Sequence, residues 1–192
     1  MSLTRRFIIT AAALAVMAPC VYAASSTQVK VETNMGSFVL ELNDKAAPKT
    51  VANFLTYVKS GFYKNTLFHR VIPNFMIQGG GFITGMEEKE TRAPIPLESR
   101  NGLTNRRGTI AMARTNNPNS ATSQFFINVR DNHFLDATQS QDGNGYAVFG
   151  KVISGMETVD AIAGVKTHSV GYYDDVPIRD VVIKNMSITK GK

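Results

Sequence analysis

Cysteine is almost absent from this 192-residue chain, because Cys20 is the only one. A single cysteine forms neither an intramolecular disulfide nor the cysteine cluster of a structural zinc site. Tryptophan is missing altogether, and the chain's three histidines are too far apart in the sequence for the usual ligand motifs. No phosphate-binding glycine loop or nucleophile elbow occurs. These absences argue against hydrolytic, metal-dependent and nucleotide-dependent chemistry, and we expect neither a metal nor a cofactor.

The charge of the chain has no strong pattern either. The formal net charge is +6, but the positive residues are scattered and no run exceeds Arg106–Arg107. A nucleic-acid-binding protein usually concentrates such residues on one patch or helix. We therefore interpret the positive charge as an aid to solubility and expect no nucleic-acid partner.

The N-terminal segment has the three-part layout of a secretory signal peptide. Arg5 and Arg6 precede the uncharged run Phe7–Pro19, and Val21–Ala23 provides a small-residue cleavage site. A spanning helix needs roughly 20 apolar residues, and the uncharged stretch is shorter, so no stable membrane insertion is expected. We predict cleavage after residue 23 and a periplasmic location.

Removal of residues 1–23 would leave residues 24–192, the size of one domain with its own core. The arginine pair leaves a twin-arginine export route open beside general secretion. Cys20 is a candidate for lipid attachment, although Pro19 stands where lipoprotein signals usually have a small residue. Cleavage after Ala23 would remove this cysteine.

The remaining chain reads as many short strands and two helices. Pro48 suits the first turn of a helix, an apolar stripe follows it, and Gly61 marks the end. A second helix is expected near residues 155–163. Strands are predicted at 29–34, 37–42, 67–71, 75–78, 109–113, 124–129, 146–152 and 180–188. In the last of these, Val181, Ile183, Met186 and Ile188 are the expected inward residues. Such a pattern favours a β-barrel, because closure removes the exposed edges of a sheet.

The segment Phe68–Gly80 carries the most informative pattern. It places Arg70 near Phe75 and Met76, so that five fixed N–H donors lie close to large apolar side chains. This combination can hold an amide or carbonyl while an apolar ring packs beside it. An ordinary salt bridge of Arg70 remains equally open from spacing alone. His69 is more typical of a hydrogen-bonded structural histidine than of a base.

This segment resembles the signature of the cyclophilin family. The resemblance continues in order through Ile110–Ala113, Ser123–Ile127, Phe134–Asp136 and Tyr146–Val152. It implies a mostly β fold, an eight-stranded antiparallel closed β-barrel capped by two α-helices. The implied activity is that of a peptidyl-prolyl cis-trans isomerase (EC 5.2.1.8), which needs no cofactor and acts on proline-containing polypeptides. With the signal peptide, this predicts a monomeric enzyme that assists the folding of exported proteins.

The resemblance also implies roles for individual residues. Arg70 matches the family's catalytic arginine, and Phe75, Met76, Phe126 and Leu135 match the pocket for the proline ring. The remaining matches to substrate-binding positions are His69, Gln78, Ala113, Gln124, Phe134 and Tyr146.

Two of these positions depart from the pattern of many eukaryotic members. Phe134 replaces a tryptophan whose ring N–H binds the drug cyclosporin, and Tyr146 replaces a histidine at one edge of the proline pocket. Weak cyclosporin binding is therefore expected. The departures suggest a bacterial, secreted branch of the family.

Two other classes of function compete with catalysis. A secreted binding module would hold proline segments without isomerising them, but such a protein would have no need for Arg70. A barrel-type carrier of small ligands requires a hollow interior, whereas the many bulky apolar residues predict a filled one.

Overall fold

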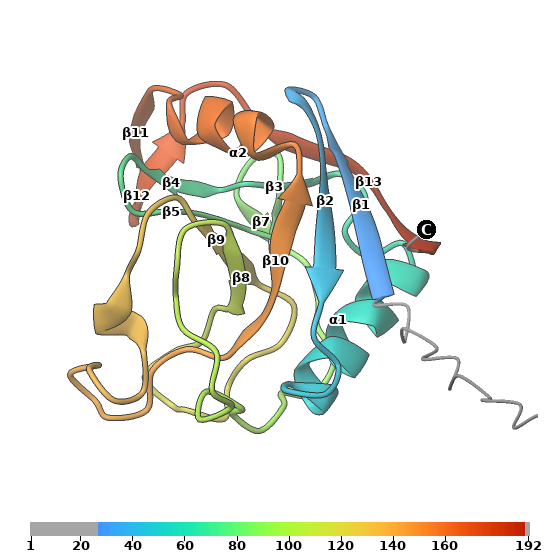
Figure 1. Ribbon diagram of the computed structural model, residues 1–192. Helices are drawn as coiled ribbons and strands as arrows, with labels where there is room; N and C mark the ends of the chain where they lie inside the picture. Colours follow the sequence, from blue (N-terminus) through green and yellow to red (C-terminus); the bar gives the residue numbers. More distant parts are fainter. Residues whose placement is uncertain (1–26, 191–192) are drawn as a thin grey trace, which may run out of the picture.

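The first two strands form where the alternating pattern predicts them. In the computed structural model, which describes residues 27–190, β1 (Thr27–Thr33) and β2 (Gly36–Leu42) pair as an antiparallel hairpin. Gly36 adopts a φ of +131°, which the tight turn requires and which favours glycine. On the other side, β1 pairs with the last strand, β13 (Val182–Lys190), so the two ends of the described chain lie side by side (Figure 1).

One antiparallel sheet dominates the molecule and curls strongly. Its hydrogen-bonded order is β3-β13-β1-β2-β10-β8-β9-β5-β4, nine strands by this count. The strands not yet located are β3 (Thr66–Leu67), β4 (Arg70–Ile72), β5 (Met76–Gly79), β8 (Thr109–Met112), β9 (Phe125–Asn128) and β10 (Val148–Ser154).

The two ends of this sheet are consecutive parts of the chain. Only Phe68 and His69 separate β3 from β4, and the Gly80 N–H donates to the Leu67 carbonyl across the junction, at 3.2 Å. Counted as one interrupted strand, β3 and β4 give the eight strands that were expected. The mostly β, antiparallel prediction is confirmed, but closure runs through this broken strand instead of a continuous ladder.

Two helices lie near opposite ends of the curled sheet (Figure 1). Helix α1 (Pro48–Lys59) begins at its proline, where the missing N–H leaves no bond unmade. Its buried face includes Val51, Phe54 and Val58, as the apolar stripe predicts. Helix α2 (Met156–Ala163) buries Val159 and Ile162 and is followed by Gly164. Both helices were predicted to within two residues at each end.

The interior of the sheet is filled by large side chains. Phe54 packs against the rings of Tyr63, Phe125 and Phe149, with centroids 5.2–5.7 Å apart. Phe54, Phe125 and Phe149 are each fully buried. The carrier hypothesis required a hollow barrel, so this core argues against it.

One detail of β13 differs from the sequence prediction. Ile188 was expected to face inward, but its exposed fraction is 41%. The register shifts between Glu32 and Thr33, and the inward residues of β13 change there from Ile183 to Met186. Ile188 lies two residues before the end of β13 and stays partly exposed there, although its ladder partner Val29 is fully buried.

Two small hairpins and one short helix were not predicted. They are β6 (Phe82–Ile83) with β7 (Glu87–Glu88), β11 (Thr167–Val170) with β12 (Tyr173–Pro177), and the 3₁₀-helix η1 (His133–Leu135). Their residues are mostly polar or exposed, so no apolar period announces them. Within residues 27–190, no helix is long and apolar enough to cross a membrane.

Candidate functional site

The candidate site lies on the outer face of four neighbouring strands. In the ladder, Arg70 of β4 pairs with Gln78 of β5, Gln78 with Phe126 of β9, and Phe126 with Ala111 of β8. Residues directly opposite in a sheet project from the same face. Arg70, Gln78 and Phe126 therefore stand in one row. The pattern of β4 and β5, read as alternating strands, already placed Arg70 among apolar groups.

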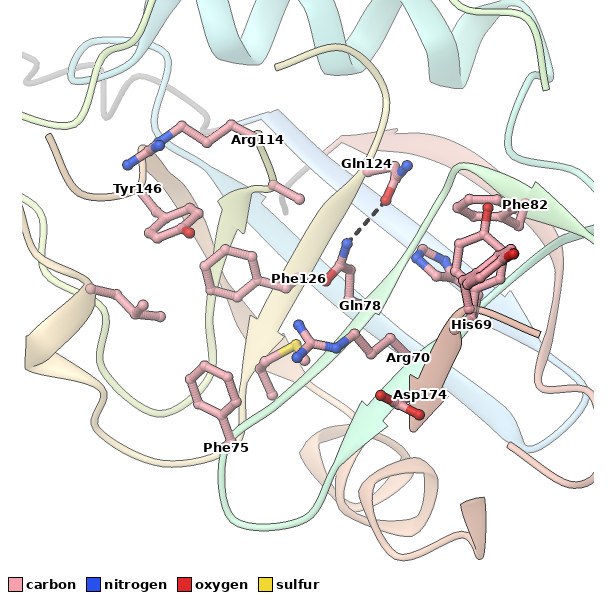
Figure 2. A pocket seen from close by; sticks show the side chains of 15 residues that line it. His69, Arg70, Phe75, Gln78, Phe82, Arg114, Gln124, Phe126, Tyr146 and Asp174 are labelled. Atoms are coloured by element: carbon pink, nitrogen blue, oxygen red, sulfur yellow. Dashed lines mark hydrogen bonds between the residues drawn. The ribbon is translucent and has the colours of Figure 1, made fainter. Parts of the chain in front are cut away.

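This row borders a cavity of about 530 Å³. Ten of the eleven residues predicted for the site line it (Figure 2), namely His69, Arg70, Phe75, Met76, Gln78, Ala113, Gln124, Phe126, Leu135 and Tyr146. Phe134 is the exception. Its ring stacks on Phe75 at a centroid distance of 5.6 Å and is half exposed, so it stands behind the pocket wall at the rim.

One end of the pocket is apolar. Met76, Phe126, Ala111 and Val148 form a small buried cluster that is separate from the main core. Phe75, Leu135 and Tyr146 pack against it while remaining partly exposed to the cavity, and the Tyr146 ring meets Phe126 edge-on at 5.6 Å. The result is an apolar recess of a size and chemistry that suit a small aliphatic ring.

Arg70 stands at the border of this recess. Figure 2 shows its side chain extending toward the space between Phe75 and Phe126. Its side chain is 44% exposed, and Nε lies 3.7 Å from Oδ2 of Asp175. A contact of this length on a half-exposed side chain is weak. The salt bridge that the sequence left open for Arg70 thus exists as a weak contact with Asp175. It involves only Nε and leaves the guanidinium exposed to the pocket.

Two glutamines form the polar side of the pocket. The Gln78 amide donates to Oε1 of Gln124 at 3.0 Å, which fixes both side chains. A side chain at Gly81 would approach Gln124 Cγ to 2.6 Å, so glycine at this position leaves room for the pair. Each amide still has hydrogen-bond donors or acceptors that this bond does not use. These groups suit a ligand with a peptide backbone, which offers both N–H donors and carbonyl acceptors.

His69 is buried beside the pocket and is neutral. Its ring lies 4.6 Å from the ring of Phe82, and only 5% of the residue is exposed. Burial lowers the pKa of His69 to about 4, although a hydrogen bond with the Leu67 backbone acts in the opposite direction. The atom Nδ1 has no hydrogen-bond partner among the described residues.

A buried polar network supports the apolar end from behind. Asn132 donates to the backbone carbonyl of Phe75 at 2.9 Å and to Oδ1 of Asn128 at 2.7 Å. Asp136 accepts from the backbone N–H of Asn105 at 2.7 Å and contacts His133 Nδ1 at 3.0 Å. These bonds tie η1, and with it Leu135, to the turn between β4 and β5 that carries Phe75. No sequence motif announced this network.

Five residues that line the pocket were not predicted. They are Phe82, Arg114, Tyr172, Tyr173 and Asp174. The Arg114 guanidinium lies 4.6 Å from the Tyr146 ring and pairs with Asp142. A backbone hydrogen bond from Asn144 and the Arg114 pair hold the pKa of Asp142 below its ordinary value. For Tyr172, Tyr173 and Asp174, the sequence offered one indication, namely two adjacent tyrosines followed by two aspartates in a polar segment.

The described part of the chain offers no group of three or more histidine, cysteine, aspartate or glutamate side chains that could hold a metal ion. The chemistry available in the pocket is thus that of a guanidinium, two amides and an apolar recess. Such a set can bind a peptide and stabilise charge that develops on it.

Comparison with known proteins agrees with this geometry. The family model described as "Cyclophilin type peptidyl-prolyl cis-trans isomerase/CLD" matches residues 28–188. A peptidyl-prolyl cis-trans isomerase of Acinetobacter baylyi is 56% identical over 167 residues, 87% of this chain and 88% of the relative. Peptidyl-prolyl cis-trans isomerase A of Dickeya dadantii is 51% identical over 183 residues, 95% of each chain.

A solved structure supports the same assignment. The cyclophilin-type isomerase of Cryptosporidium parvum superposes with a TM-score of 0.69 at 30% identity, covering 88% of this chain and 99% of that one. Fold, pocket and sequence agree over nearly the whole described chain. The protein belongs to the cyclophilin family and is a peptidyl-prolyl cis-trans isomerase (EC 5.2.1.8), whose substrates are proline-containing peptides.

Proposed function

We propose that Arg70 lowers the barrier to rotation while the recess formed by Phe75, Met76, Phe126 and Leu135 holds the proline ring. The observation that carries this proposal is the row across the sheet, in which the guanidinium lies at the border of the apolar recess. A ring anchored in the recess brings its X-Pro bond to Arg70.

The chemistry follows from the nature of the barrier. Rotation about an X-Pro bond is slow because resonance gives the C–N bond partial double-bond character. In the twisted state this resonance is lost, and the proline nitrogen becomes pyramidal and basic. It can then accept a hydrogen bond that the planar amide nitrogen does not accept. Arg70 in this position binds the twisted state better than either planar isomer, which is what catalysis requires.

The expected size of this effect is modest. A hydrogen bond that involves a charged group contributes roughly 1.5–3 kcal/mol. That corresponds to about one to two decades in rate. The rest of the acceleration would come from anchoring the ring in the recess while the carbonyl side of the peptide rotates. No bond is broken, so neither a nucleophile nor a cofactor takes part.

The other predicted residues would hold the peptide. Gln78 and Gln124 have amide groups for its backbone, and Ala113 forms the wall of the groove. Tyr146 closes one edge of the recess, and Phe134 supports Phe75 from the rim. His69 would have a structural role, because burial keeps it neutral and its ring packs against Phe82 at a tilted angle.

Substitution of Arg70 tests this assignment. Arg70→Ala is expected to lower kcat/KM for a proline peptide in a protease-coupled assay by about one to three decades. Arg179→Ala is the matched control, because Arg179 is exposed and lies outside the pocket lining. Thermal unfolding of both variants should match the parent. Activity close to that of the parent in Arg70→Ala would remove Arg70 from the mechanism.

We further propose that the clients of this isomerase are exported proteins and that residues 24–192 form the mature, periplasmic enzyme. The charged, apolar and small-residue layout of residues 1–23 supports this, although that segment lies outside the described residues. The alignment with the Dickeya dadantii isomerase A spans 183 residues, so it extends into the first 26.

The intact mass of protein isolated from the periplasm decides the export proposal. A mass that begins at Ala24 is the expected result. Retention of the apolar segment, or an added lipid on Cys20, would contradict cleavage after Ala23. Recovery from the cytoplasm alone, with the full-length mass, would contradict export itself.

A further inference from the structure

The hairpin β11–β12 contributes a second end to the substrate pocket. Tyr172, Tyr173 and Asp174 line the cavity from this hairpin, and β12 packs against β4, the strand of Arg70. Figure 2 shows Asp174 beside the Arg70 side chain, on the side of the pocket away from Tyr146. The proline recess and this corner thus lie on opposite sides of the guanidinium.

The charges at this corner do not cancel. Arg70 has Asp175 as its partner, with 3.7 Å between Nε and Oδ2. Asp174 accepts a hydrogen bond from the Ser169 hydroxyl at 2.6 Å, but it makes no ion pair with any residue of the described chain. Arg114, the other cation of the pocket lining, is already paired with Asp142 near Tyr146. One carboxylate therefore faces the pocket without a cation.

Aromatic rings accompany this carboxylate. Tyr172 is fully exposed. Tyr173 is 42% exposed as a residue, and its ring meets Phe82 edge-on at 5.3 Å. Exposed aromatic side chains that lie together beside a pocket are able to form a binding surface. Tyrosine faces attract ammonium and guanidinium groups, and a carboxylate strengthens that attraction by a charged hydrogen bond.

A buried polar atom lies at the same end of the pocket. His69 lines the cavity, is 5% exposed, and has an Nδ1 atom without a hydrogen-bond partner among the described residues. Buried polar atoms normally have a partner. Because Nδ1 itself is buried, a bound peptide does not reach it, and His69 contributes to this end of the pocket as a neutral part of its wall.

We propose that Tyr172, Tyr173 and Asp174 select substrates with a lysine or arginine close to the isomerised proline. Arg70 contacts Asp175, and the proposed function places the same guanidinium at the proline nitrogen. Since an extended peptide rises roughly 3.3 Å per residue, the cation falls within about three residues of the proline. This inference rests on the proposed role of Arg70 in one respect: that role fixes the distance along the peptide between the cation and the proline.

A peptide series tests the selection directly. Each peptide carries one lysine at one of the three positions before or after proline, and its partner carries glutamine there. We expect the parent enzyme to favour lysine by about two- to tenfold in kcat/KM at one or two positions. Asp174→Asn should bring this ratio to about one. Asp44→Asn removes the same charge from an exposed site outside this pocket and should leave the ratio unchanged.

Two further measurements keep the test decisive if Asp174→Asn does not fold. The lysine-to-glutamine ratio of the parent should shrink as salt is raised from low to physiological concentration, because exposed charge pairs are screened. Tyr172→Ala should lower the ratio without changing any charge. A ratio near one in the parent at every position, or an equal ratio in the parent and Asp174→Asn, overturns the proposal. Because only ratios are compared, either result is distinct from a failure of Arg70→Ala.

Discussion

The two faces of strands β4, β5, β8 and β9 differ sharply although they share one backbone. On the inner face, Val71 pairs with Ile77, and Ile127 pairs with both Ile77 and Ile110. All four are fully buried in the main core. On the outer face, the same ladder carries Arg70, Gln78 and Phe126, which border the pocket. Along these strands, residues that stabilise the core therefore alternate with residues that border the pocket.

The difference teaches how a short strand can serve both purposes. Successive side chains of a strand point to opposite faces, so Arg70 can be half exposed while its neighbour Val71 is completely buried. The inner face holds its shape by close contact of apolar side chains. The outer face then projects polar groups from a rigid support, which keeps them in position without a ligand.

The largest effect should come from the adjacent pair Phe125 and Phe126, which point to opposite faces. Phe125→Ala removes a ring that packs against Phe54, Tyr63 and Phe68, and should lower the free energy of unfolding by about 3–5 kcal/mol. Phe126→Ala enlarges an existing pocket, so it should cost less stability and more kcat/KM. Denaturant unfolding and peptide turnover measure both. Equal losses of stability and activity in the two variants would contradict the separation of the faces.

The second effect concerns His69, which lies between the two faces at the strand break. Burial lowers the pKa of His69 from its ordinary value of 6.5 to about 4 in the folded protein, so the unfolded chain binds the proton more strongly. Stability from neutral His69 is present above pH 6.5 and is lost as the pH falls toward 4. The full loss is roughly 3 kcal/mol.

Unfolding free energies measured from pH 7 to pH 4 check this expectation. His69→Gln does not titrate, so its stability should fall less over this interval than that of the parent. His168→Gln is the control, since His168 is exposed on β11. A parent and His69→Gln that lose the same stability would show that His69 is not buried neutral.

The smallest effect concerns the rim. Phe134 has an apolar ring but no N–H donor, so a cyclosporin carbonyl that an indole would bind is left unpaired. Such an orphaned group costs roughly 1–3 kcal/mol. We therefore predict weak inhibition of the parent and at least about tenfold tighter binding by Phe134→Trp. Peptide turnover should change little, because Phe134 touches Phe75 from behind the pocket.

Inhibition constants and turnover are measured together on the same two proteins. Nanomolar inhibition of the parent would contradict the role given to Phe134. So would a tryptophan variant whose inhibition constant equals that of the parent.

The inner face was easier to predict from sequence than the outer one. Apolar periods locate α1 and α2. The resemblance to the family, which begins at Phe68–Gly80 and continues to Val152, identifies ten residues that line the pocket. The supporting role of Asn132 and Asp136 could not be predicted in this way. Their role depends on bonds to Phe75 and Asn105, which are 57 and 31 positions away in the sequence.

The β11–β12 hairpin was missed for a different physical reason. Tyr172 and Asp174 are exposed, so they follow no apolar period, and Asp175 adopts a φ of +59° that ordinary strands do not show. The irregular bulge between His168 and Val170 further obscures the strand pattern. Only the three-dimensional position beside β4 reveals that this segment reaches the pocket.

The central claim is that Arg70 binds the twisted peptide bond better than the planar one. The most direct test is exchange NMR on a proline peptide with the parent, Arg70→Lys and Arg70→Ala, which yields both the isomerisation rate on the enzyme and the Kd of the ground state. The account predicts that the rate falls by about one to two decades in Arg70→Ala while Kd changes less than about threefold, with Arg70→Lys between. A rise in Kd that equals the loss of activity, with an unchanged rate on the enzyme, would contradict it and would make Arg70 a binding residue.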